Sequence, residues 1–241
     1  MYQPLQCIAL RTVRHSDRHN ILTAYSRQYG RVALLLPAAS TQRANAMRAV
    51  SMPMGRFDCV ADIRAGRDIF NISDMHRRGP MPSASPVKSA IAMFTADVAA
   101  SLLREPQPDP HLFDFLDFWS HTLAQASAAT TANSHIAFLI SMMHFMGIEP
   151  DWSTYTSGAV FDMADGIFRL APPSHHLYLP SAEASQAYAL RRLNMRTAHL
   201  FAMHRNERNR ILDTLLRYYH THFPAIGTLN SLPVLRTLFD F

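Results

Sequence analysis

Cysteine is scarce in this chain, and its scarcity excludes two kinds of small-domain architecture. The 241 residues include only two cysteines, Cys7 and Cys59. Two are too few for a disulfide framework or for a zinc knuckle. Both lie within apolar strand patterns, so we expect them to be small buried hydrophobic residues.

Long hydrophobic runs are also missing. The longest apolar stretch, residues 136–146, is interrupted by His144, and it is well short of the roughly 18–20 residues that span a bilayer. The first residues, MYQPLQ, show no basic segment followed by an apolar one, so no secretory signal is visible. We therefore expect a cytoplasmic protein.

Motifs of the common enzymes are absent. There is no GxSxG, no HExxH and no phosphate-binding loop, and the acidic residues are scattered. The histidines closest to a metal-ligand spacing are His175 with His176 and His220 with His222, and no cysteine or carboxylate clusters with either pair. Because a metal site usually needs three or more convergent ligands, we predict no metal, no cofactor and no catalytic residue.

Lysine is nearly missing, and the charge is divided along the chain. Lys88 is the one lysine among 23 basic residues. The net charge is +7 over residues 1–80, −7 over residues 81–185 and +5 over residues 186–241. Arginine-biased codon usage would explain the missing lysine without any function. Arginine is nonetheless the stronger partner for phosphate, because its planar fork donates two hydrogen bonds at once.

Strand patterns fill the first eighty residues. Residues 18–36 alternate in period two on both sides of a tight turn at residues 28–31, where Gly30 can supply a positive φ. We predict further strands over residues 5–13, 51–64 and 67–73, and a mobile loop or one short helical turn over residues 38–48. Five such strands fit a closed barrel of the OB type, and an SH3-like barrel fits the pattern nearly as well.

A proline-rich linker over residues 79–86 separates the strands from helical patterns. We predict an α+β chain with two domains, residues 1–79 and 80–241. The first is an OB-like five-stranded β-barrel that binds nucleic acid. The second is an all-helical domain with a β-hairpin inserted near residues 154–180, where Ala164-Asp165-Gly166 supplies the turn.

Helix boundaries follow from proline, glycine and capping residues. Pro86 suits the first turn of one helix, and a second helix carries residues 112–123. An apolar, central helix is predicted to end at Gly147. The predicted amino-terminal caps of this helix and of the last two helices are, in order, Asn133 or Ser134, Asn206, and Ser231.

Several local patterns, in this order, resemble one family. They are Asp17 to Arg31 around the first turn, LLREPQPDPHLFDFL (residues 102–116), FLISMMHFMGIEPDW (residues 138–152), and the tail with Tyr218-Tyr219, His222 and NSLPVLRTLF. Together they span most of the chain and resemble the RecO family of recombination mediators. Many members carry four zinc-binding cysteines after the Gly-Pro break. This segment has none, so the chain is identified as similar to a zinc-less variant with the hairpin in that place.

The resemblance implies a non-enzymatic mediator of DNA recombination and repair, cytoplasmic and associated with the nucleoid. Such a protein would bind single- and double-stranded DNA and the acidic C-terminal tail of single-strand-binding protein. With its partner RecR it would help load the recombinase RecA, and it would promote annealing of complementary strands.

The charge pattern indicates where DNA would bind. Single-stranded nucleic acid is held by arginine on phosphates and by aromatic side chains on bases. On the barrel, Tyr25, Tyr29, Phe57 and Phe70 are available by sequence for stacking. The small residues 37–40 replace a basic loop common in the family, so Arg43 and Arg48 are expected to take over its phosphate contacts. The full set of predicted DNA-binding residues is Arg14, Arg18, Arg27, Arg31, Arg43, Arg48, Arg205, Arg208 and Arg210.

Two other classes of protein stay open from the residues alone. One is a non-catalytic adaptor that binds proteins and whose basic barrel does not bind DNA. The other is an enzyme whose pocket lies beside the central helix. A separate alternative concerns the arginines at residues 205–210: if they do not hold an anion, we expect them to pair with acidic residues of the middle segment such as Asp114 or Asp117.

Overall fold

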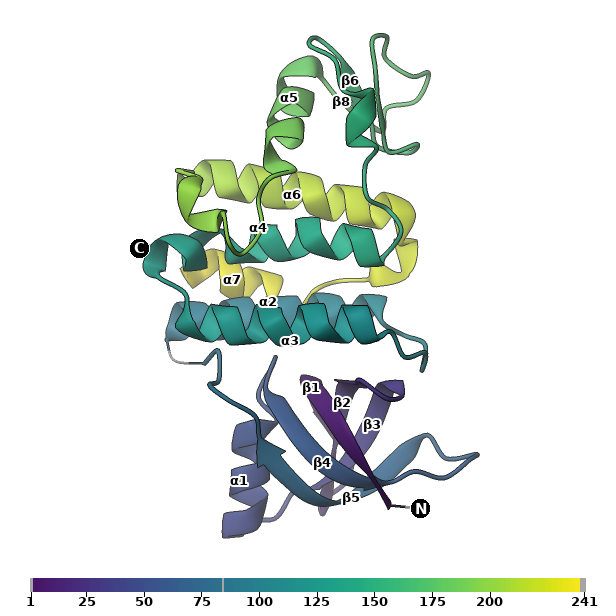
Figure 1. Ribbon diagram of the computed structural model, residues 1–241, viewed down its shortest axis with the longest axis vertical. Coiled ribbons are helices and arrows are strands. Elements are labelled where there is room, and N and C mark those ends of the chain that lie inside the picture. Colours follow the sequence, from purple (N-terminus) through teal and green to yellow (C-terminus); the bar gives the residue numbers. More distant parts are fainter. Residues whose placement is uncertain (1, 84, 239–241) are drawn as a thin grey trace. The chain divides into compact units, whose positions relative to one another are not determined.

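The structure is a computed structural model that describes residues 2–83 and 85–238 (Figure 1). The chain groups into two compact units. The first, the barrel unit, is the segment up to Ala126 together with the chain from Thr228 on. The second, the α4–α6 unit, is Ser127–Gly227. The predicted division at residue 79 stays a prediction, since this grouping keeps the next two helices with the barrel.

Five strands close into a barrel in the order β1-β2-β3-β5-β4, with β4 pairing back onto β1. All contacts are antiparallel except the short parallel one between β3 and β5. The predicted α+β class, with an OB-like barrel ahead of helices and a small extra sheet, is therefore confirmed. The strands are β1 (Tyr2–Arg14), β2 (His19–Ser26), β3 (Gly30–Pro37), β4 (Arg56–Asp62) and β5 (Ile69–Arg77).

The first turn forms where the sequence predicts it. Ser26 pairs with Gly30, which leaves a three-residue loop, and Gly30 has a φ of 65°. Three-residue hairpin loops commonly close on a residue in this left-handed conformation. A Cβ on Gly30 would also lie 2.3 Å from the carbonyl oxygen of Gln107. Two independent constraints therefore require glycine at this position.

The segment between β3 and β4 differs from the prediction. It forms helix α1 (Gln42–Val50), which is longer than the one short helical turn predicted there as the alternative to a loop. The Thr41 hydroxyl accepts a hydrogen bond from the amide of Ala44 at 3.2 Å. The long strand predicted from residue 51 is also wrong, because turns occupy residues 51–54 and β4 begins only at Arg56. Met54 has a φ of 59°, a conformation that ends regular strand geometry.

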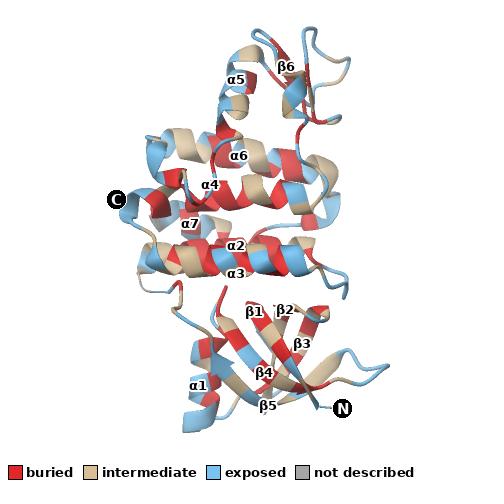
Figure 2. Cartoon of the chain, viewed as in Figure 1, coloured by how far each residue is buried: buried red, intermediate tan, exposed pale blue. Residues whose placement is uncertain are grey.

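The barrel interior is apolar, and Figure 2 shows buried residues along the barrel strands. Cys7 and Cys59 are both buried in it, as predicted. On β1, Ile8 and Leu10 are buried as well, and β1 packs against the helices that follow the barrel. The interior residues are Leu5, Cys7, Ala9, Leu22, Ala24, Val32, Leu34, Leu36, Met47, Val50, Phe57, Cys59 and Ala61.

Three helices complete the barrel unit: α2 (Pro86–Leu102), α3 (Pro110–Gln125) and α7 (Leu232–Leu238). Pro86 lies in the first turn of α2, as predicted, and the Ser85 hydroxyl caps that helix. Before α7, both the amide and the hydroxyl of Ser231 donate to Asp97 on α2, at 3.1 and 2.8 Å. Ser231 therefore immediately precedes α7, where the sequence predicts it, but its side chain donates to α2 and links the two helices.

In the α4–α6 unit, α4 (Ala128–Phe145) is the central buried helix that the sequence predicts. Its end is confirmed, since Gly147 follows with a φ of 67°. Its predicted start is wrong: Ser127 caps it, and Asn133 and Ser134 are buried inside the helix. Asn133 instead donates to two carbonyl oxygens of the segment around residues 198–201.

The hairpin after α4 is confirmed. Strands β6 (Val160–Asp162) and β7 (Ile167–Arg169) pair around Gly166, and β8 (Tyr178–Leu179), which the sequence did not predict, adds to the other edge of β6. Helices α5 (Ser181–Leu190) and α6 (Arg205–His222) follow. The N-cap position of α6 is His204 rather than the predicted Asn206. Short 3-10 turns lie at Trp152–Thr154, Ala198–Leu200 and Pro224–Ile226. Within the described ranges, every helix is too short or too polar to cross a membrane.

Candidate nucleic-acid interface

The outer faces of β1, β2 and β3 carry exposed and partly exposed residues. Leu22, Leu34 and Leu36 point into the interior, so the residues between them point outward. In one cross-strand row, Val13 pairs with Ile21 and Ile21 with Leu35. All three are at least partly exposed, which gives the barrel an apolar row at its surface.

A second row lies next to the first and brings in an arginine that the sequence analysis missed. Arg11 pairs with Thr23, and Thr23 with Ala33. Arg11 is exposed. Simple alternation from the interior residues Cys7 and Ala9 would point Arg11 inward. An irregularity in β1 between Ala9 and Arg11 turns it outward instead. We call the two rows together the β1–β3 face.

The loop from β1 to β2 borders this face with two of the predicted arginines. Arg14 and Arg18 are both exposed. Arg14 forms an ion pair with Asp17 at 2.6 Å, and the Ser16 hydroxyl accepts hydrogen bonds from the amides of Arg18 and His19. The loop thus has local order while the guanidinium of Arg18 stands at the surface.

Arg31 lies one row further along and turns toward α2. Its Nη1 donates to the carbonyl oxygens of Ala100 and Leu103, at 3.0 Å each, at the carboxyl end of that helix. Burial, together with the nearby charges of Arg104 and Arg11, lowers the pKa of Arg31. Arg104, like Arg11, was missed, because only the fold brings the end of α2 to the barrel. Three arginines therefore gather at this edge of the β1–β3 face.

Arg27 points to α3 instead. It forms an ion pair with Asp114, and its guanidinium lies 5.4 Å from the ring centre of Phe113. Arg78 approaches the same ring at 5.5 Å. These contacts join the barrel to α3, so whether Arg27 and Arg31 also touch DNA stays a prediction.

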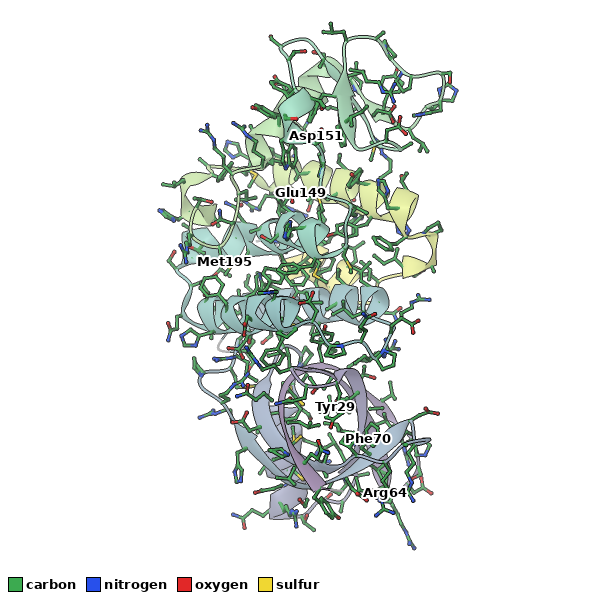
Figure 3. The ribbon with its side chains drawn as sticks, turned by 45° about the vertical axis from the view of Figure 1, so that its right-hand side comes forward. Tyr29, Arg64, Phe70, Glu149, Asp151 and Met195 are labelled. Atoms are coloured by element: carbon green, nitrogen blue, oxygen red, sulfur yellow. The ribbon has the colours of Figure 1, made fainter. Side chains whose placement is uncertain are left out.

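Two of the four aromatic residues predicted for stacking are buried in the barrel. Phe57 is fully buried in its interior, and Tyr25 is 2% exposed beneath the segment that precedes α3. The Tyr25 hydroxyl accepts from the amide of Asp109 at 3.1 Å, and burial raises the pKa of this tyrosine. Tyr29 and Phe70 pack against the interior from its rim (Figure 3). Apolar contact on this face therefore falls to Val13, Ile21 and Leu35.

On α1, the two predicted arginines differ in exposure. Arg43 is exposed and its guanidinium donates to the carbonyl oxygen of Ser73 on β5. Arg48 is half-buried and donates to Asn45 within the same helix. Their role as phosphate contacts stays a prediction.

The arginines of α6 are not equivalent. Arg205 and Arg210 are exposed, whereas Arg208 is half-buried and donates to the carbonyl oxygen of Met203 at 2.5 Å. Burial lowers the pKa of Arg208. The sequence raised the alternative that these arginines pair with Asp114 or Asp117, but both carboxylates already bind other arginines. Asp114 binds Arg27, and Asp117 binds Arg56 and Arg78.

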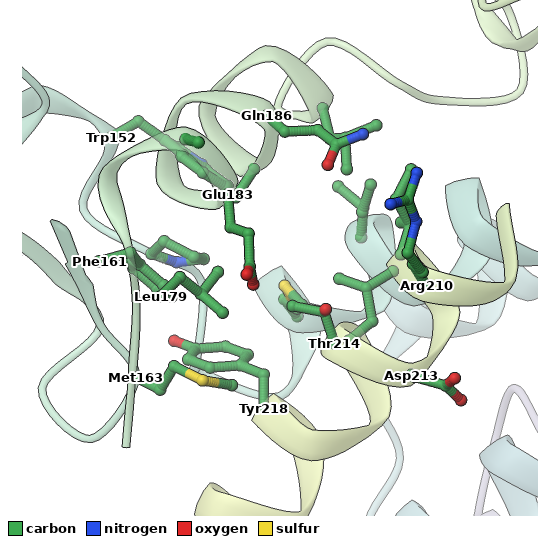
Figure 4. Close-up of a pocket in the computed structure, with 18 residues that line it drawn as sticks. Trp152, Phe161, Met163, Leu179, Glu183, Gln186, Arg210, Asp213, Thr214 and Tyr218 are labelled. Atoms are coloured by element: carbon green, nitrogen blue, oxygen red, sulfur yellow. The ribbon is translucent and has the colours of Figure 1, made fainter. Parts of the chain in front are cut away.

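A pocket of about 460 Å³ lies in the α4–α6 unit beside Arg210. Its walls are mainly apolar and come from α4, the hairpin, α5 and α6, including Trp152, Phe161, Leu190 and Tyr218. Figure 4 shows the carboxylate of Glu183 pointing into the space between α5 and α6, with Arg210 on the α6 side. The pocket can take an apolar side chain, and its rim carries both signs of charge.

Comparison with known families and proteins agrees with this architecture. The chain matches the family described as Recombination protein O N terminal over residues 1–78, and the family described as Recombination protein O C terminal over residues 83–231. The DNA repair protein RecO of Phocaeicola vulgatus is 32% identical over 242 residues, which cover 100% of both chains. That of Bacteroides fragilis is 32% identical over 246 residues, again 100% of both, and that of Porphyromonas gingivalis is 30% identical over 98% of each chain.

A closed OB-like barrel followed by helices, with each part matching one half of a two-part family, defines the architecture of a recombination protein O. The chain belongs to the RecO family of DNA repair proteins.

Proposed function

We propose that this protein is a non-enzymatic recombination mediator that binds single- and double-stranded DNA through the β1–β3 face. The observation that carries this proposal is a partly exposed apolar row, Val13, Ile21 and Leu35, bordered by exposed Arg11, Arg14 and Arg18. OB barrels use the face of strands two and three and the adjoining loops for oligonucleotides. Here the arginines would hold phosphates, and the apolar row would contact unstacked bases.

Strand annealing follows from the same charges. Two DNA strands repel each other through their phosphates, and arginines that neutralise phosphates on both strands reduce that repulsion. Such contacts read no sequence, so annealing would depend only on complementarity of the strands. Loading of RecA with RecR, on DNA of the nucleoid in the cytoplasm, is the cellular step that we assign to this activity.

The acidic C-terminal tail of single-strand-binding protein is the proposed protein partner of the α4–α6 unit. Arg205 is exposed at the start of α6, where the helix dipole also favours anions, and Arg210 is exposed in the next turn of the helix. The pocket beside Arg210 would take an apolar side chain of the tail. Glu183 points into the pocket, and its carboxylate would repel a carboxylate of the bound tail.

The DNA proposal is tested by fluorescence anisotropy of labelled single-stranded DNA over a salt series. Replacing Arg11, Arg14 and Arg18 together by Gln should weaken binding equally for all sequences. It should also make the log–log salt slope shallower by up to about 0.7 for each phosphate that the protein no longer neutralises. Arg217→Gln removes one exposed arginine from the far half of α6 and serves as the control for losing an arginine charge outside this face. Absence of DNA binding by the unaltered protein at low salt would favour the adaptor, and an unchanged slope in the triple variant would refute this site.

The tail proposal is tested with a synthetic peptide of that acidic tail. Arg210→Gln should weaken peptide binding, because it removes the cation at the pocket. Glu183→Gln should strengthen it, because it removes a repelling carboxylate. Opposite effects of two neighbouring substitutions separate charge recognition from a general disturbance of the pocket. Equal effects of the two would contradict the assignment.

A further inference from the structure

Three side chains that are not among the pocket-lining residues form a column in the α4–α6 unit. The rings of Tyr155 and Tyr188 stack face to face, with centroids 3.8 Å apart and planes within 12° of parallel. The guanidinium of Arg191 lies over the Tyr188 ring, 3.7 Å from its centroid. The column therefore runs from Tyr155 through Tyr188 to Arg191.

Surrounding contacts hold each member of the column in place. Phe168 packs edge-on against both tyrosines, at 5.2 and 6.0 Å between centroids. The Tyr155 hydroxyl lies 3.2 Å from the Ser185 hydroxyl oxygen. Arg191 Nη1 donates to the Tyr188 carbonyl oxygen at 2.8 Å, which orients the guanidinium. A ligand that extended the column would meet a surface already in its binding conformation, which lowers the entropy lost on binding.

The end of the column at Arg191 has the chemistry of a base-stacking surface. A guanidinium is planar and has two faces, and Tyr188 covers one of them. Arg191 is half-buried, so part of its surface remains open. Unpaired nucleobases stack on aromatic rings and on arginine planes in proteins that bind single strands.

The charge of the surrounding segment favours the same ligand. Residues 186–210 contain six arginines and one acidic residue, Glu207. The Glu207 carboxylate accepts a hydrogen bond from Gln186 at 2.9 Å. A polyanionic strand is therefore attracted to this part of the α4–α6 unit.

We propose that the Arg191 end of this column is a second DNA site, which takes an unpaired nucleobase of single-stranded DNA. This proposal rests on the proposed function, because it requires that the protein binds DNA. The site selects single strands, because the bases of a duplex are already stacked on one another. It accepts any base, since every base has a stacking face.

Arg191 also has a structural role at the end of α5, and the experiment must distinguish that role from base stacking. It follows the last residue of α5 and caps it, and a cation there is favoured by the helix dipole. Arg191→Lys keeps the positive charge at that position and removes the planar group. Arg192→Lys makes the same exchange at the exposed neighbour and is the matched control.

The experiment measures the affinity of both variants for three DNA ligands of equal length. They are a normal single strand, a fully abasic strand with the same phosphates, and a duplex. Loss of one stacked base costs about 1–3 kcal/mol, so Arg191→Lys should bind the normal strand about fivefold or more weakly. Its affinity for the abasic strand and the duplex, its salt slope and its melting temperature should match those of the unaltered protein and of Arg192→Lys.

Three results would overturn the proposal. Equal binding of the normal strand by Arg191→Lys and the unaltered protein would mean that no base stacks there. Equal weakening for the normal and abasic strands would mean a phosphate contact instead. Failure of the unaltered protein to bind any DNA would refute the proposed function itself, and this site with it. Tyr188→Leu, which removes the ring beneath the guanidinium, should reproduce the selective loss if the variant folds.

Discussion

Arg56 on β4 and Asp117 on α3 form a two-pronged ion pair that joins the barrel to the helix beside it. Nε donates to Oδ1 at 3.0 Å and Nη2 to Oδ2 at 2.8 Å. The side chains are only 11% and 23% exposed. Arg78 binds the same carboxylate, and His121 Nδ1 lies 3.0 Å from Arg56 Nη1. One carboxylate of the acidic middle segment therefore serves two barrel arginines.

We expect Asp117→Asn to destabilise the barrel unit by about 1–3 kcal/mol. The expected loss of stability is smaller than that for breaking a fully buried ion pair and larger than that for breaking an exposed one, because solvent partly screens Asp117. Urea unfolding measures the change. Asp114→Asn is the control, since Asp114 and Arg27 are 56% and 37% exposed and such pairs contribute about 1 kcal/mol or less. Equal losses in the two variants would contradict the central role of Asp117.

We expect Arg31→Gln to lower the stability of the barrel unit, whether or not Arg31 also contacts DNA. Its guanidinium donates two hydrogen bonds to the end of α2, and hydrogen bonds of charged groups contribute about 1.5–3 kcal/mol. Thermal unfolding and the anisotropy salt series measure the two properties. A shallower salt slope with an unchanged melting temperature would mean that Arg31 contacts phosphate.

The buried His135 on α4 should make stability depend on pH. Burial, and then the charge of Arg208, lower its pKa to about 3. Between that value and the ordinary pKa of about 6.5, the unfolded chain binds a proton that the folded chain does not. Stability is therefore full above about pH 6.5 and falls as the pH drops toward 3, by up to about 1.4 kcal/mol per pH unit.

Urea unfolding at pH 7 and pH 5 measures this loss. His135→Leu should show a smaller difference between the two pH values than the unaltered protein, because the variant removes the titrating group. His220→Gln, at an exposed position of α6, is expected to keep the full difference. If His135→Leu also kept it, another group would be responsible.

The hairpin region should be stable without zinc. Phe161 and Phe168 pack with their ring centroids 4.9 Å apart. Buried Asp162 accepts the amides of Ala164 and Asp165 and pairs with Arg169 at 3.1 Å. Among the described residues, no three histidine, cysteine, aspartate or glutamate side chains gather as metal ligands.

We therefore expect a chelator to leave the melting temperature unchanged, whereas Asp162→Asn should lower it. Asp165→Asn, at the exposed neighbour, is the control and should have a smaller effect. Stoichiometric zinc in the purified protein, lost on chelation together with stability, would contradict this prediction.

Local chemistry in the sequence determined the elements that need no distant partner. The turn at Gly30, the start of α2 at Pro86, the end of α4 before Gly147 and the hairpin around Gly166 all lie where predicted. Each depends on the φ preference of one residue or on a short alternating pattern. The order of the barrel and the helices followed from where the periodicity changes.

Tertiary structure decided what the outward residues touch. Asn133 and Asn206 have the chemistry of caps, but Ser127 and His204 occupy those positions. Tyr25 has the chemistry of a stacking ring, but the segment before α3 covers it. Arg27 and Arg31 were indistinguishable from Arg18 by sequence, because a guanidinium suits a carboxylate, a helix end or a phosphate equally well. Only the packing of α2 and α3 on the barrel determines which arginines remain open to solvent, because residues far apart in the chain supply the competing partners.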